Sequence, residues 1–215
     1  MIGNKQMIMI FLPAILVVSF GLFLQTRRYE PLLPKANADS VSTKLYNIPI
    51  LPEDPIIGNP LAPLTIINFA DFGCDHCKDE MALLDRILKQ YPNKLKIIWK
   101  GLPVTRFPYP SDLSHDYAYC ANAQGKFAAF ANAVFAHNES LTADSLNSLA
   151  DASQLDKGKL TSCLSSSAPA TYRDKTATLA STLKITGVPA VFIQDKQVDT
   201  PTTLEGWKVL LGLTP

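Results

Sequence analysis

Hydrophobic and polar positions fall into blocks of different period along the chain, and each block predicts an element of secondary structure. Two short apolar runs, LTIINFA at 64–70 and LKIIW at 95–99, are rich in β-branched side chains and predict buried strands. Between them, apolar residues from Met81 to Tyr91 recur at the spacing of a helix. We therefore expect the folded part to begin near Pro63 with a strand, a helix and a second strand.

The second half of the chain has a different pattern. Residues 111–183 predict a block of helices, with Ser114, Thr142 and Asp156 as candidate N-caps. The stretch ITGVPAVFIQ and the following QVDT predict two strands joined by a short turn, and residues 204–211 predict a closing helix. The order is strand, helix, strand, helical block, strand, strand, helix. It predicts an α/β fold with an inserted all-helical domain.

The N-terminal segment contains an unbroken apolar run, MIMIFLPAILVVSFGLFL at residues 7–24, without a charged side chain. Its length is about the minimum for a helix that spans a bilayer, so we predict that residues 1–28 form a transmembrane anchor. The alternative is a signal peptide, because residues 36–38 (ANA) resemble a cleavage site. Basic residues flank the run on both sides, so the flanking charges do not decide its orientation.

Composition defines the remaining regions and excludes some classes of function. Residues 29–59 are rich in proline, asparagine, serine and charge, which predicts a tether leading to a folded domain at 60–215. Over the whole chain, 20 lysines and arginines stand against 19 aspartates and glutamates, so we expect no nucleic-acid partner. No G-x-G-x-x-G, P-loop, H-E-x-x-H or G-x-S-x-G motif occurs, and we expect neither a cofactor nor hydrolytic chemistry.

The strongest chemical signal is the sequence CDHC at residues 74–77, where the first predicted strand passes into the first helix. A cysteine at a helix N-terminus is partly thiolate, because unsatisfied backbone N–H groups and the helix dipole favour an anion. The thiolate is the attacking species in disulfide exchange. We therefore predict Cys74 as the nucleophile, and Cys77, one turn further into the helix, as the resolving cysteine.

The two intervening residues have opposite expected effects on this thiol. A protonated His76 near the Cys74 sulfur would stabilise the thiolate, whereas the carboxylate of Asp75 would raise the Cys74 pKa. In the alternative interpretation, both side chains lie in solvent and have little influence. We take His76 as a candidate catalytic residue.

The other two cysteines bear on whether the motif binds zinc instead. A structural zinc site needs four ligands, usually as two close pairs, and neither Cys120 nor Cys163 has a partner at C-x-x-C spacing. His115 precedes Cys120 by five residues and would lie on another helical face. We therefore expect no metal site. Cys120 and Cys163 are either buried free thiols or a structural disulfide, and an even number of cysteines in an exported chain favours the disulfide.

Several stretches carry a resemblance to a known family. They are DPIIGNPLAPLTIINFADFGCDHC, AYCANAQGKFAAFANAVF with the later LTSCLSS, and ITGVPAVFI, and together they cover most of the chain beyond the tether. In this order they resemble the thioredoxin-fold disulfide oxidoreductases of the DsbA kind. The resemblance implies a thioredoxin-like fold with an inserted helical domain. It also implies that Pro189 is cis and faces the active-site sulfur, while the backbone of Val188 binds an extended substrate.

The chain departs from the family pattern at two positions. Asp75 occupies the place after the first cysteine where the family usually has proline. Asn68 occupies a place where the family commonly has a buried acid that relays protons. Because asparagine cannot accept a proton, a water or another group must do this work. These departures bear on the redox potential and its direction, not on the fold.

These observations predict an anchored thiol-disulfide oxidoreductase on the periplasmic side of a bacterial inner membrane, or a soluble periplasmic one after signal cleavage. Its substrates would be unfolded or partly folded exported proteins with free cysteines, into which it introduces disulfides. By resemblance, a membrane partner of the DsbB kind would reoxidise it. The alternatives are a disulfide reductase or isomerase, and a non-catalytic thioredoxin-fold chaperone or surface binding module.

Overall fold

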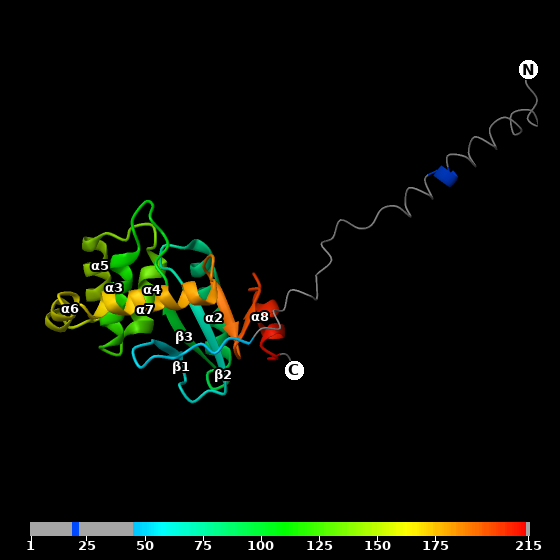
Figure 1. The fold of residues 1–215 in the computed structure, drawn as a ribbon, viewed down its shortest axis with the longest axis horizontal. Helices are drawn as coiled ribbons and strands as arrows, with labels where there is room; N and C mark the ends of the chain where they lie inside the picture. The colour runs from blue at the N-terminus through cyan, green and yellow to red at the C-terminus, as the bar shows by residue number, and fades with distance from the viewer. Residues whose placement is uncertain (1–18, 22–44, 214–215) are drawn as a thin grey trace, which may run out of the picture. The chain divides into compact units, whose positions relative to one another are not determined.

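The computed structural model describes residues 19–21 and 45–213 (Figure 1). The chain divides into two units, Met1–Ser40 and Val41–Pro215. In the first unit, residues 19–21 are helical and exposed. None of the helices in the described part of the chain is both long and apolar enough to cross a membrane. Apart from residues 19–21, the predicted anchor at residues 7–24 lies outside the described residues and stays a prediction.

Within residues 45–213, the chain forms a five-stranded mixed sheet with the order β1-β3-β2-β4-β5. The central strands β2 and β3 are parallel, and each of the other pairings is antiparallel. A helix joins β2 to β3, as the change of period at residue 74 predicts. The strands are β1 (Ile56–Gly58), β2 (Leu64–Ala70), β3 (Leu95–Gly101), β4 (Ala190–Ile193) and β5 (Lys196–Val198).

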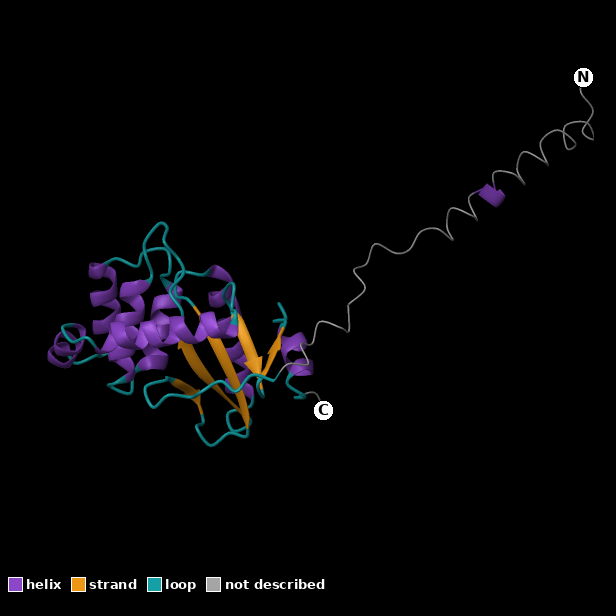
Figure 2. Ribbon diagram, viewed as in Figure 1, coloured by secondary structure: helices purple, strands orange, loops and turns teal. Residues whose placement is uncertain are grey.

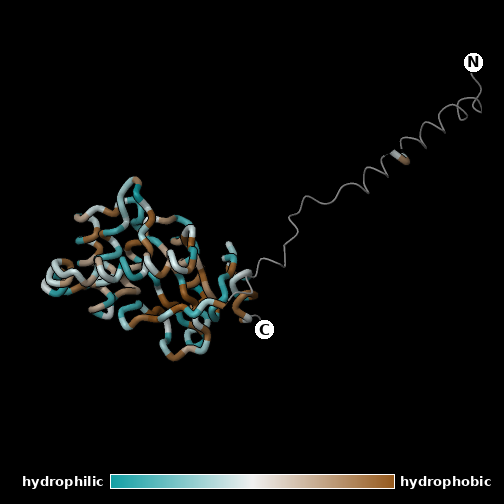
Figure 3. The backbone as a smooth tube through the Cα atoms, viewed as in Figure 1, coloured by the Kyte–Doolittle hydropathy of each residue, from teal (hydrophilic) through white to brown (hydrophobic). Residues whose placement is uncertain are grey.

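Helices cover both faces of this sheet (Figure 2). Successive side chains of β2 point to opposite faces. Ile66 therefore packs toward α2 and α8, while Ile67 packs toward α7. Figure 3 shows the resulting hydrophobic stretches along the central strands. The helices are α2 (Asp75–Gln90), α3 (Asp112–Asn122), α4 (Phe127–Ala136), α5 (Ala143–Ala152), α6 (Lys157–Leu164), α7 (Ala168–Leu183) and α8 (Leu204–Leu210).

The predicted helical block corresponds to α3 to α7, which lie between β3 and β4 in the chain. Thr142 and Asp156 cap α5 and α6 through side-chain oxygens, as predicted. The prediction of Ser114 as an N-cap was wrong, because α3 begins earlier, with Ser111 as its N-cap. Asp112 places a negative charge in that first turn, where it complements the helix dipole. Ser114 lies inside the helix and donates its hydroxyl to the Ser111 carbonyl.

The predicted tether at 29–59 was wrong in its last part. Ile48 is buried against the sheet, and β1, at residues 56–58, pairs with β3. The segment has no regular apolar period, so local pattern could not reveal its packing. Its burial depends on a partner far along the chain, since Asp54 forms a buried ion pair with Lys100 of β3.

Candidate active site

The CDHC motif lies at the point where β2 passes into α2. Cys74 is the N-cap of α2 and has extended backbone angles, and its sulfur accepts a hydrogen bond from the Cys77 backbone N–H at 3.2 Å. Gly73, just before it, packs closely against Thr105, since a Cβ added at Gly73 would lie 2.7 Å from the Thr105 side chain. The Cys74 sulfur is therefore held at the helix N-terminus, as the sequence predicts.

The two cysteines differ sharply in exposure and in acidity. Both are free thiols, with their sulfurs 2.6 Å apart; Cys74 is partly exposed and Cys77 is fully buried. The hydrogen bond from the Cys77 thiol lowers the pKa of Cys74 from 9.0 to about 7, against the effect of burial and with help from the Cys77 and His76 backbone N–H groups. That same hydrogen bond, together with burial, raises the pKa of Cys77. At neutral pH, Cys74 is thus the available nucleophile.

The difference in acidity predicts a pH-dependent reactivity. In the reduced protein, alkylation of Cys74 by iodoacetamide should rise with pH through a midpoint near 7, because the thiolate forms above its pKa. Cys77 should stay unmodified over the same range, since it is buried and its pKa is raised. Mass spectrometry of the alkylated peptide measures the extent of alkylation at Cys74 and at Cys77. A Cys74 midpoint near 9, or equal labelling of Cys77, would contradict this geometry.

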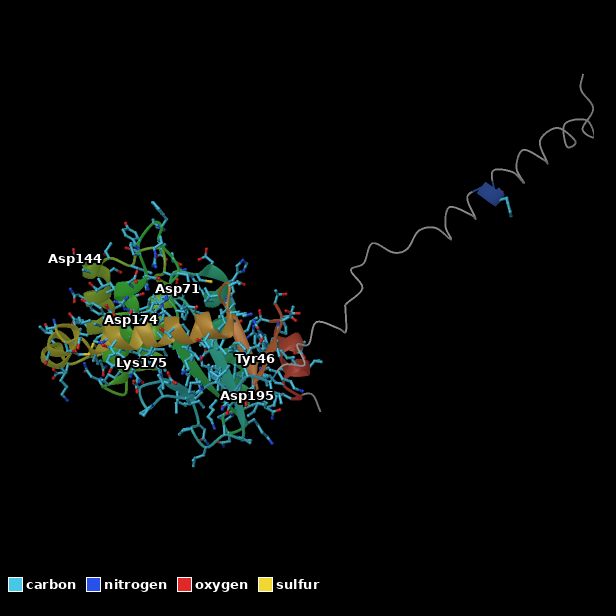
Figure 4. All side chains as sticks on the ribbon, viewed as in Figure 1. Tyr46, Asp71, Asp144, Asp174, Lys175 and Asp195 are labelled. Atoms are coloured by element: carbon cyan, nitrogen blue, oxygen red, sulfur yellow. A yellow bond between two sulfur atoms is a disulfide. The ribbon has the colours of Figure 1, made fainter. Side chains whose placement is uncertain are left out.

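A buried pair of side chains, Asp71 and His115, lies directly beneath the motif. The Asp71 carboxylate, labelled in Figure 4, accepts hydrogen bonds from the His115 ring at 3.0 Å and from the backbone N–H groups of Gly73, Val104 and Thr105. Burial alone would raise the pKa of Asp71, but the hydrogen bond and charge of His115 bring it below its usual range. Its negative charge in turn raises the pKa of Cys74. Sequence reasoning considered His115 only as a zinc ligand and missed this pair.

The structure brings Val188 and Pro189 to the same site from the other end of the chain. Their peptide bond is cis, in agreement with the resemblance. The Val188 carbonyl oxygen lies 3.8 Å from the Cys74 sulfur, although the two residues are 114 positions apart. Both Val188 and Pro189 are partly exposed, immediately before the first residue of β4. An extended chain that reached Cys74 would therefore meet backbone groups at this point.

A groove of about 490 Å³ runs beside the motif along α2. His76 is exposed and lines this groove, and its backbone N–H, as noted, helps to lower the Cys74 pKa. Asp75 turns to the helical insertion, where it accepts a hydrogen bond from the Asn138 amide at 2.8 Å. The groove is lined by His76, Asp79, Glu80, Ala82, Leu83, Arg86, Pro189, Thr200, Pro201 and Thr202.

Sequence reasoning also missed a buried carboxyl group at this site, that of Glu80. Its side chain accepts a hydrogen bond from the Asn68 amide at 2.7 Å, across the face of β2 that α2 covers. Burial raises the pKa of Glu80 to about 8. The signal was present, because Glu80 follows Cys77 by three residues on one helix and so shares its face.

Cys120 and Cys163 lie away from the motif, where they form a disulfide between α3 and α6. Within residues 19–21 and 45–213, no three His, Cys, Asp or Glu side chains are grouped so as to hold a metal ion.

The chain matches a family model, and solved structures of other proteins share its fold. A family model described as Thioredoxin matches residues 51–212. A thioredoxin-like oxidoreductase from Silicibacter pomeroyi has the same fold, with a TM-score of 0.67 and 22% identity over 76% of this chain and 92% of that one. The catalytic domain of Proteus mirabilis ScsC is equally similar, with a TM-score of 0.67 and 23% identity over 79% and 91%.

The curated relatives are much longer than the matching region. The Na(+)/H(+) antiporter NhaA 3 of Salinispora tropica is 24% identical over 159 residues, which are 74% of this chain and 24% of that protein. This chain therefore spans about a quarter of that relative's length.

Proposed function

The chain belongs to the thioredoxin family, and on this basis we propose that it is a thiol-disulfide oxidoreductase that acts through Cys74 and Cys77. One observation carries the proposal. A partly exposed Cys74 sulfur at the N-terminus of α2 lies 2.6 Å from the buried Cys77 sulfur. This arrangement lets a substrate reach one sulfur only and keeps the second sulfur ready for an intramolecular reaction.

The proposed cycle starts from the disulfide between Cys74 and Cys77. A substrate thiolate attacks the Cys74 sulfur and forms a mixed disulfide, while Cys77 leaves as a thiolate and takes up a proton. A second thiolate of the substrate then attacks the substrate sulfur of this mixed disulfide and releases Cys74 as a thiolate. The substrate has lost two electrons to the cysteine pair and has gained a disulfide. Substrate backbone would pair beside Val188, next to the Cys74 sulfur.

Two features favour the oxidising direction. The lowered pKa of Cys74 stabilises the reduced protein, which makes its disulfide a stronger oxidant. The Cys120–Cys163 disulfide is typical of proteins in oxidising compartments. We therefore propose unfolded exported proteins as substrates, the periplasm as the compartment, and a membrane enzyme of the DsbB kind as the group that restores the disulfide.

A transfer assay with a redox titration tests this function. The oxidised full-length protein should pass one disulfide to a reduced peptide with two cysteines, and a Cys74→Ser/Cys77→Ser variant should pass none. Titration against glutathione should place the potential above about −200 mV for an oxidase, whereas a reductase would lie near −270 mV. A pair that glutathione does not reduce, and that transfers nothing, would support the non-catalytic alternative.

A further inference from the structure

We propose that Glu80 exchanges a proton with Cys77 each time the active-site disulfide opens or closes. The inference rests on the proposed function, because it concerns a step of thiol-disulfide exchange. Glu80 lies on α2, next to Asn68, and would supply a function that the two cysteines alone do not have.

Cys77 needs a proton partner because it is fully buried. A buried thiolate is costly, so a Cys77 that leaves as an anion must be protonated, and a Cys77 that attacks must first lose its proton. Bulk water does not reach this sulfur directly. A buried group that can both give and take a proton near neutral pH meets the requirement.

Glu80 lies three residues after Cys77 on the buried face of α2, and it has unused hydrogen-bonding capacity. Its side chain is 4% exposed, and Oε1 accepts a hydrogen bond from the Asn68 amide. Among the described residues, Glu80 Oε2 and Asn68 Oδ1 are both buried atoms without a hydrogen-bond partner. Both are acceptors when the carboxyl is ionised. A proton on Glu80 would turn one of these two acceptors into a donor.

The electrostatic surroundings support proton exchange near neutral pH. Burial and the charge of Cys74 together raise the pKa of Glu80 to about 8, against the hydrogen bond from Asn68, which lowers it. Glu80 in turn raises the pKa of Cys77. The groove that Glu80 lines also contains the charged or titratable side chains of His76, Asp79 and Arg86.

In this step a proton passes from the Glu80 carboxyl group to Cys77, and in the reverse step it returns. When a substrate thiolate attacks Cys74, the substrate–Cys74 bond forms and the Cys74–Cys77 bond breaks. The electron pair of the broken bond stays on Cys77, which takes the proton from the Glu80 carboxyl and leaves a carboxylate. In the reverse direction, the Glu80 carboxylate removes the Cys77 proton and Cys77 attacks the mixed disulfide. Glu80 recovers its protonation state through the groove that it lines.

Rapid mixing of the reduced full-length protein with oxidised glutathione separates the relevant steps. Acid-quenched samples, measured by mass spectrometry, report first the mixed disulfide at Cys74 and then its resolution by Cys77. In the parent, the resolution rate should rise with pH through about 8 and then level off, as the Glu80 carboxylate forms. Glu80→Gln should slow resolution about 100-fold and remove this plateau, while formation of the mixed disulfide continues.

Two further variants control for structure and charge. Asp79→Asn removes a carboxylate from the same groove, and its resolution rate and pH profile should match those of the parent. The double variant Asn68→Asp/Glu80→Gln returns a carboxyl group to the same buried pair from the strand side. It should recover at least about tenfold of the lost rate together with a plateau, which a merely structural role of Glu80 would not produce.

The outcomes are distinct. If the parent forms no mixed disulfide at Cys74, the proposed function fails. If the parent does so and Glu80→Gln resolves it at the parent rate with an unchanged pH profile, the role of Glu80 is refuted. Should Glu80→Gln not fold, NMR of ¹³C-labelled glutamates in the parent decides instead. One carboxyl should titrate near pH 8 and differ between the oxidised and reduced states. Ordinary titration of all glutamates would overturn the proposal.

Discussion

Replacement of Cys77 by alanine is expected to leave the protein covalently attached to its substrates, whereas replacement of Cys74 by alanine should leave it unattached. In the parent, the Cys77 sulfur lies 2.6 Å from the Cys74 sulfur and can expel a bound substrate at once. Well-oriented intramolecular reactions reach effective molarities of about 10⁵ M or more, so loss of Cys77 should prolong the mixed disulfide by about 10³-fold or more. Non-reducing electrophoresis of cells that express each variant measures the attached species.

The reciprocal variant provides the control for this prediction. Cys74→Ala keeps a single motif thiol, that of Cys77, which is fully buried, so substrates should not reach it. Burial also still raises its pKa once the hydrogen bond with Cys74 is gone. The adducts of Cys77→Ala should disappear on reduction and in the double variant. Equal capture of proteins by both single variants would mean that the roles of the two cysteines are wrongly assigned.

The parts of the site that could be predicted from the sequence are those with a local signature. The spacing of Cys74 and Cys77 at a change from strand to helix period is visible in four residues and their flanks. The Val188–Pro189 pair was found by resemblance, because no local property distinguishes its proline from one that begins an edge strand. In each case a short stretch of chain carries the information.

The remaining parts of the site depend on contacts between distant residues. Asp71 and His115 are 44 positions apart and meet only because α3 packs beside the end of β2. In the sequence, Asn68 indicates only that the buried acid common in the family is absent. In the structure, the Glu80 carboxyl group accepts a hydrogen bond from the Asn68 amide. A sequence pattern reports which face of an element is apolar, but not which polar side chain of a neighbour will occupy a gap in that face.

The same distinction between local patterns and distant contacts explains which parts of the fold could be predicted. The strand β2 and the helix α2 follow long or strongly apolar patterns, and their predictions are confirmed. The strand predicted over ITGVPAVFIQ is confirmed only in part, as β4 covers Ala190–Ile193. The short strand β1 was missed because its three residues carry almost no periodic signal, and it is stabilised by pairing with β3. The predicted strand covered only residues 95–99, because the apolar run ends at Trp99. In the structure, β3 continues through that residue to Gly101.

Asp54→Ala is expected to lower the free energy of unfolding by about 3–5 kcal/mol, because it leaves the buried Lys100 ammonium without its counter-ion. Both side chains of this pair are fully buried. The Asp54 carboxylate also accepts hydrogen bonds from the Tyr172 hydroxyl at 2.8 Å and from the Leu51 backbone N–H at 2.6 Å. One side chain therefore joins the segment before β1 to β3 and to α7. Urea unfolding followed by circular dichroism measures the loss.

Two variants separate the buried charge from other effects of this substitution. Glu53→Ala removes the neighbouring carboxylate, which pairs with Lys175 at 2.8 Å on the surface, and it should change stability far less because solvent screens that pair. Asp54→Leu combined with Lys100→Met removes both buried charges and should recover most of the loss, since the desolvation cost disappears with them. If the double variant were as unstable as Asp54→Ala, the hydrogen bonds of Asp54 to Tyr172 and Leu51, rather than the unpaired lysine, would account for the effect.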